Sequence, residues 1–201
     1  MAITAQRVAA GFFGKVPSHG DFVARRLPPG FLVPWDAWLQ AGLAESRALL
    51  GEAWLPLYLN SPVWRFAFDA GVCGPQAWAG LVMPSVDRVG RYFPMTLAAA
   101  LSGPRAAGQS LVPDEVWYAR LDALALSCLD EGFSLEAFDA GLRALAPPAL
   151  RGAVAATAAP VVAQARFWRD RGPGHGPASL VFRGMPAPVR YTAMLGDSND
   201  E

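Results

Sequence analysis

Three apolar runs that follow one another closely along the chain constrain the fold most. They span residues 63–68, 78–83 and 93–101, and short polar segments connect them. Runs that are apolar almost throughout are typical of strands covered on both faces of a sheet. Short connections between successive strands favour antiparallel pairing. The sequence therefore predicts a sheet built around these three strands.

Further elements extend this sheet and cover it. Apolar residues recur at helical spacing over residues 31–50. Asp114 and Glu115 open a predicted helix at 116–129, and Ser134 is placed to cap another at 135–145. These elements predict a single α/β domain, in which helical layers sandwich a mixed or mostly antiparallel sheet.

Shorter segments complete the predicted secondary structure. Strands are expected at residues 8–13, 167–168 and 179–183, and a closing helix at 188–195. Residues 18–25 are expected to hold a short turn of helix that Asp21 caps. Residues 146–163 are rich in Ala, Pro and Val, and their pattern favours no single structure.

Composition narrows the functional class. The chain has 201 residues, of which 53% are hydrophobic and 17% charged, so it can form one sizeable core. We expect one domain over residues 1–201, ending in a flexible tail at 196–201. Lys+Arg and Asp+Glu both number 17, and a neutral chain lacks the basic field that non-specific nucleic-acid binding requires.

The remaining bulk features concern location. No uninterrupted run of about 20 apolar residues occurs, so no integral membrane segment is expected. Cys73 and Cys128 are far apart and belong to no paired-cysteine motif, a pattern that favours a reducing compartment over a disulfide framework or a zinc site. We therefore expect a cytoplasmic protein. The four tryptophans that lie in apolar contexts are expected in the core: Trp64, Trp78, Trp117 and Trp168.

Two dense polar segments contrast with this apolar background. They are residues 11–22 and 83–94, and each follows an apolar run that is predicted to be a strand. Such similar combinations of Gly, Pro, Ser, Asp and cations suggest one shared polar site. The candidate binding residues of this site are Lys15, Ser18, Asp21, Asp87, Arg88 and Arg91.

The residues leave two interpretations of this cluster open. Arg88 and Arg91 are three residues apart, so both guanidinium groups could hold a carboxylate or phosphate, or contact a partner protein. Alternatively, Asp21 could bind backbone amides of its own turn. Asp87 could then pair with Arg25, Arg88 or Arg91 and join the two loops as a purely structural staple.

Catalytic motifs are weak in comparison. Ser18, His19 and Asp21 are nearly adjacent, a spacing that rarely aligns a nucleophile, a base and an orienting group. There is no Gly-x-Ser-x-Gly elbow, and Lys15 does not belong to a phosphate-binding loop because Val16 stands where Ser or Thr is needed. We therefore expect no enzymatic activity and no cofactor. A small hydrolase or phosphoryl-binding enzyme using Ser18, Asp21, Asp87 and Arg88 remains the alternative.

Metal binding has little support in the sequence. The chain has two histidines, and His175 lies in a Gly- and Pro-rich loop where a solvent-facing surface position is expected. Asp21 and Asp87 could bind Mg²⁺ only with a third ligand that the sequence does not identify. No metal is expected.

Three ordered blocks of sequence resemble the TagF proteins of bacterial type VI secretion, also called ImpM. Residues 11–22 are similar to the opening signature of that family, residues 61–66 to its second block, and residues 83–94 to its third. Weaker similarity continues through residues 179–186, so the family-like part covers about 8–195.

This resemblance implies a fold and a role. It implies an α/β sandwich and a non-catalytic, post-translational repressor of type VI secretion. The implied partner is the cytoplasmic scaffold protein of that apparatus, which carries a forkhead-associated domain, and no small-molecule substrate is implied. A structural accessory component of the secretion apparatus is the third possibility.

Overall fold

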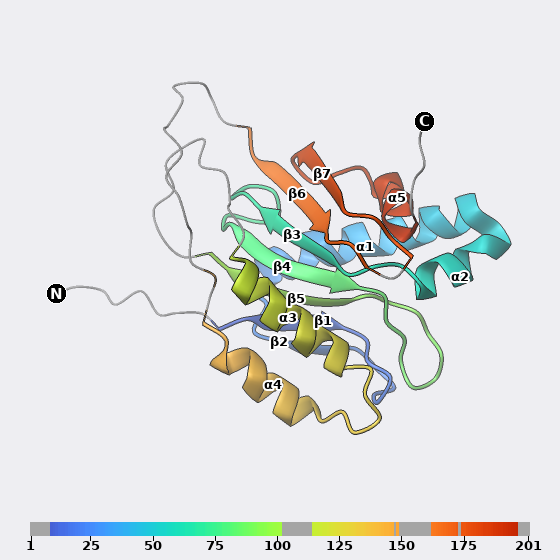
Figure 1. Ribbon diagram of the computed structural model, residues 1–201. Coiled ribbons are helices and arrows are strands. Elements are labelled where there is room, and N and C mark those ends of the chain that lie inside the picture. The colour runs from blue at the N-terminus through green and yellow to red at the C-terminus, as the bar shows by residue number, and fades with distance from the viewer. Residues whose placement is uncertain (1–8, 102–113, 147, 149–161, 173, 197–201) are drawn as a thin grey trace.

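A single antiparallel sheet organises the protein. The computed structural model describes residues 9–101, 114–146, 148, 162–172 and 174–196. Within them the chain forms a seven-stranded sheet in the order β2-β1-β5-β4-β3-β6-β7 (Figure 1). The strands are β1 (Gly11–Gly14), β2 (Val23–Arg25), β3 (Trp64–Phe68), β4 (Trp78–Met83), β5 (Met95–Ala100), β6 (Gln164–Arg169) and β7 (Ala178–Arg183).

Helices cover both faces of this sheet. Figure 1 shows α3 and α4 on one face and α1 behind the other. The helices are α1 (Pro29–Leu50), α2 (Trp54–Leu59), α3 (Glu115–Ser127), α4 (Leu135–Ala144) and α5 (Thr192–Leu195), with short 3₁₀ turns η1 (Gly51–Ala53) and η2 (Pro188–Tyr191). The predicted α/β class, with an antiparallel sheet between helical layers, is confirmed. No helix of the described residues is long and apolar enough to cross a membrane.

Local signals explain where the helices begin and end. The Asp114 carboxylate accepts a hydrogen bond from the Trp117 amide at the start of α3, and the Ser134 hydroxyl accepts one from Ala137 at the start of α4. These bonds satisfy amides that have no acceptor inside the helix. Helix α1 ends at Gly51, whose φ of 53° lies in the left-handed region.

The sheet separates two apolar clusters. On the α1 face, Trp35 and Trp38 contact aromatic rings of β3 and β6. Trp64, Phe66 and Phe68 all belong to this cluster, which confirms that they share one face of β3. On the other face, Trp117 and Phe138 of α3 and α4 cover β1, β4 and β5. The four tryptophans predicted to be in the core are all buried.

One secondary-structure prediction is wrong. Residues 18–25 form no helix; they form a turn that leads into β2, where Ala24 pairs with Phe13 of β1. Phe22 stacks on Phe13, with ring centroids 5.4 Å apart, and meets Phe93 edge-on at 4.9 Å. This ring contact and the β-ladder hold the segment extended. The predictions for residues 149–161 and 197–201 lie outside the described residues.

Candidate functional site

The two polar segments meet at one end of the sheet, beyond the last residues of β1 and β4. Strands β1 and β4 are both antiparallel to β5 and therefore run in the same direction. The segments that follow them therefore leave the sheet at the same end, where β1 and β4 finish. The Arg88 amide donates to the carbonyl of His19 at 2.9 Å, and the Ser85 hydroxyl donates to the carbonyl of Lys15 at 2.7 Å. Backbone and side-chain hydrogen bonds thus join two segments that lie about seventy residues apart in the sequence.

Asp87 is the centre of the bonding between the segments. Its Oδ2 accepts from Lys15 Nζ at 2.9 Å and from Arg91 Nε at 2.7 Å. Its Oδ1 accepts from the amides of Val89 and Arg91 at 3.0 and 2.9 Å. Both Lys15 and Asp87 are buried, and a buried charge pair of this kind depends on complete hydrogen bonding.

The pKa of Asp87 reflects these contacts. Burial by itself raises the pKa of the carboxyl group. The hydrogen bonds from the backbone amide of Arg91, from Lys15, from the Arg91 side chain and from the Val89 amide outweigh burial, and together they hold the pKa of Asp87 well below its ordinary value. The carboxylate therefore remains ionised in the folded protein at neutral pH.

Tyr58 supports the second segment from below, a role that sequence reasoning missed. Its hydroxyl donates to the Ser85 carbonyl at 2.8 Å and accepts from the Ser85 amide at 3.0 Å. Tyr58 comes from α2, for which the sequence predicts no structure. A tyrosine in an apolar run carries no local signal of a partner 27 residues away.

The predicted site residues divide into a buried and an exposed group. Lys15 and Asp87 are buried, whereas the other four are exposed: Ser18, Asp21, Arg88 and Arg91. We use the term staple for Asp87 and the two cations bonded to it, Lys15 and Arg91. Arg91 still contributes to the staple, because its guanidinium also donates to the Gly20 carbonyl. A side chain at Gly20 would begin 3.6 Å from the Arg88 guanidinium, so Arg88 lies directly over the first segment.

Apolar side chains accompany the exposed charges. Phe22 is 45% exposed and Val89 is 65% exposed. Phe22 is also held from below, because Lys15 Nζ lies 5.1 Å from its ring centroid. We use the term docking surface for the exposed residues Asp21, Phe22, Arg88 and Val89.

The catalytic chemistry available to the two polar segments is limited. Both oxygens of Asp87 already accept hydrogen bonds, so this carboxylate is poorly placed to act as a base. Ser18 Oγ lies 2.9 Å from His19 Nδ1, but the Asp21 carboxylate accepts from the Phe22 amide, and among the described residues no carboxylate orients the His19 ring. In that part of the chain, no three His, Cys, Asp or Glu side chains are grouped to hold a metal.

A second ionic cluster surrounds Arg65, which is the second residue of β3. Its guanidinium pairs with Asp122, Glu115 and Asp170, with nearest distances of 2.6, 2.9 and 2.7 Å. A cleft of about 460 Å³ lies beside it. Burial removes water from Arg65, but the hydrogen bond to Asp122 and the three negative charges raise its pKa above the ordinary value.

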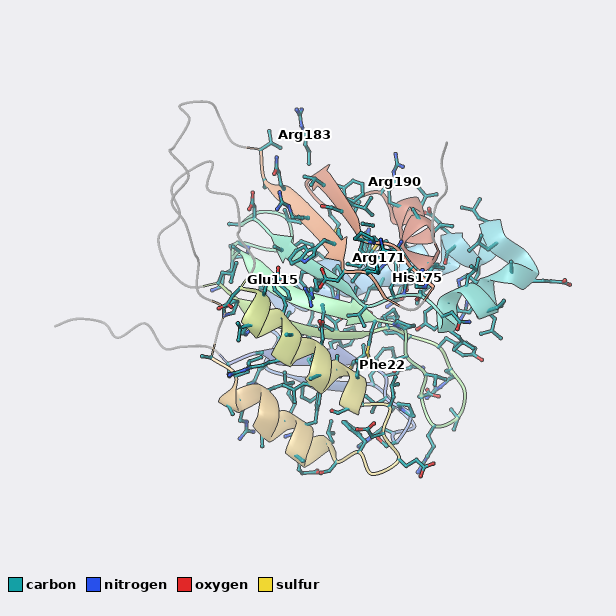
Figure 2. The ribbon with its side chains drawn as sticks, viewed as in Figure 1. Phe22, Glu115, Arg171, His175, Arg183 and Arg190 are labelled. Carbon is teal, nitrogen blue, oxygen red and sulfur yellow. The ribbon has the colours of Figure 1, made fainter. Side chains whose placement is uncertain are left out.

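His175 borders this cleft and does not have the plain surface position expected of it. Its Nε2 lies 2.8 Å from the Asn60 carbonyl, and Figure 2 shows His175 beside Arg171 in the same loop. Glycines and prolines in the loop suggested exposure, but the imidazole anchors the loop to Asn60, the C-cap residue of α2.

A third ionic cluster contains Arg25, which pairs with a different carboxylate from the one suggested by the sequence. Arg25, offered above as a partner of Asp87, instead contacts Asp139 of α4 at 3.3 Å. Asp139 also pairs with Arg26 and, at 2.8 Å, with Arg143. These bonds attach β2 to α4. Arg25 therefore contacts the helical layer of α3 and α4 and takes no part in the staple.

Comparison with known proteins agrees with this architecture. Residues 11–145 match the family described as the TagF N-terminal domain, type VI secretion system-associated. The chain also resembles the crystal structure of PA0076 from Pseudomonas aeruginosa PAO1, with 34% sequence identity, a TM-score of 0.84 and 96% of each chain covered. No curated protein sequence matches the chain significantly. The matched region contains both polar segments and both helices of the α3 face, and the chain therefore belongs to the TagF N-terminal domain family of type VI secretion-associated proteins.

Proposed function

We propose that this protein is a non-catalytic repressor of type VI secretion that acts in the cytoplasm. Its partner is the scaffold protein of the apparatus that carries a forkhead-associated domain. Family membership supports the association with type VI secretion. The regulatory role and the partner extend the proposal beyond that association.

The docking surface carries the proposal. Phe and Arg are residue types that are enriched at protein interfaces. Phe22 lies in the first polar segment, and Arg88 of the second segment lies over Gly20 of the first. Phe22 and Val89 are both exposed. The Asp87 staple fixes both loops before a partner arrives. A preformed surface loses less conformational entropy on binding than a loop that must first become ordered.

The same geometry disfavours the enzymatic alternative. The hydrolase hypothesis requires Asp87 as an acid or base, and its carboxylate is enclosed by Lys15, Arg91 and two amides. A panel of phosphoester and ester substrates, tested with and without Mg²⁺, separates the two functions. Turnover that is lost in Ser18→Ala would support the enzyme and count against the regulator.

Secretion itself tests the repressor role. In the parent bacterium, deletion of the gene should raise the amount of a type VI substrate in the medium, and overproduction of the protein should lower it. Equal secretion in all three strains would refute the proposal. Stoichiometric copurification with assembled secretion complexes would instead favour a structural accessory component.

A further inference from the structure

Strand β7 forms a long open edge of the sheet. It pairs with β6 on one side, and no described segment pairs with its other side. The opposite edge of the sheet, β2, has only three residues. Short edge strands are a common protection against unwanted strand pairing, and β7, with six residues and no proline, lacks it.

The register shows which backbone groups of β7 are free. The Gly184 amide donates to Ala163, and the Asp69 amide donates to Gln164 on the other side of β6. Along an antiparallel strand, the backbone groups of successive residues point alternately to the two neighbouring strands. Gln164 bonds toward β3 and Ala163 toward β7, so residues 165, 167 and 169 of β6 also bond toward β7. Their partners in β7 are residues 182, 180 and 178. The amides and carbonyls of Ser179, Val181 and Arg183 therefore point outward.

The core is incomplete at this edge. On β6, the inward side chains Ala165 and Phe167 are 0% exposed. The corresponding side chains of β7, Leu180 and Phe182, are only partly buried. An additional strand beside β7 would cover both, and apolar side chains on its inward face would add to the α1-side core.

Charge selects the kind of strand. The outward face of β6 and β7 carries two arginines, Arg166 and Arg183, and neither strand contains a carboxylate. The third arginine, Arg169, is buried on the other face. Val181 lies opposite Arg166 and is 50% exposed, while Arg183 projects away from the body of the protein (Figure 2). Neither Arg166 nor Arg183 has an ion-pair partner among the described residues. The outward face next to β7 thus favours acidic side chains.

We propose that the β7 edge binds an extended segment of a partner protein in which acidic and apolar residues alternate. The segment would add an eighth strand, with its apolar side chains over Leu180 and Phe182 and its carboxylates beside Arg166 and Arg183. A second copy of this chain fits less well, because it would bring two Arg183 side chains to the same seam. This surface is separated from the docking surface by β3 and β6, so either proposal can fail alone.

Amide exchange of the full chain provides the first test. In the free protein, the amides of Val181 and Arg183 should exchange about a hundredfold faster than those of Leu180 and Phe182, which bond to β6. Equal protection of all four amides would overturn the proposal, because the edge would then already be covered. Protection of Val181 that rises with protein concentration would identify a second copy as the occupant and also overturn it.

A peptide titration provides the second test. The probe is an acetylated, amidated hexapeptide of alternating Val and Glu, and the control probe has Lys in place of Glu. The Glu probe should slow exchange at Val181 saturably and bind about tenfold more tightly than the Lys probe. Val181→Pro should abolish binding with the β6 ladder intact, since it removes an outward amide, whereas Val181→Thr should bind normally. Equal binding to Val181→Pro and Val181→Thr would refute edge addition.

Discussion

Replacing Tyr58 by Phe tests whether the hydroxyl under the second polar segment stabilises the fold. The substitution removes one oxygen and creates almost no cavity, but it leaves the Ser85 amide without its partner, while the Ser85 carbonyl keeps its hydrogen bond from the Phe93 amide. Ser85 is 4% exposed, so water cannot easily replace that partner. An unsatisfied buried polar group costs about 1–3 kcal/mol, and we expect a loss of about 2 kcal/mol in the free energy of unfolding.

Urea unfolding and a thermal melt would measure this loss. For a chain of this size, 2 kcal/mol corresponds to a fall in Tm of about 4–8 °C. Tyr92→Phe is the matched control: its ring meets that of Tyr58 edge-on at 5.8 Å, and its hydroxyl forms no hydrogen bond within the described part of the chain. The reasoning would be refuted if both variants lost the same stability, or if Tyr58→Phe lost none.

Three further predictions concern buried ionisable groups. Because Asp87 has a lowered pKa, the stability advantage of wild type over Asp87→Asn should be constant above about pH 5 and should shrink below about pH 4, as chemical denaturation across pH would show. Arg65→Lys keeps the charge but loses the guanidinium fork that joins Asp122 and Glu115, so urea titration should show a loss of about 1–3 kcal/mol, whereas an unchanged midpoint would count against the cluster. Burial raises the pKa of Cys73 and of Cys128 to about 12, so a colorimetric thiol reagent at pH 8 should label neither in the native protein and both in denaturant.

Local signals predicted most of the architecture. The caps at Asp114 and Ser134 mark the helix starts within a residue, because each cap acts on amides two or three positions away. The apolar runs of β3, β4 and β5 were recognisable because both faces of these strands are covered. Residues 18–25 defeated local reasoning because a ring stack and pairing with β1 outweigh the capping preference of Asp21.

The candidate site was only partly predictable for the same physical reason. Sequence pattern gathered the six polar residues, but it could not divide them into a buried pair and an exposed group. That division depends on the contact between Lys15 and Asp87, which are 72 positions apart. The Asp139 and Arg65 clusters were missed altogether, since their partners come from elements that have no regular spacing between them.

Calorimetric titration of the scaffold protein from the same secretion system tests the central claim most directly. The wild type should bind saturably, and Arg88→Glu should bind at least about tenfold more weakly with unchanged circular dichroism. Arg190→Glu, an exposed charge reversal on η2, is the matched control and should bind like wild type. Wild-type affinity in Arg88→Glu would contradict the docking surface, and no binding by the wild type would contradict the proposed partner.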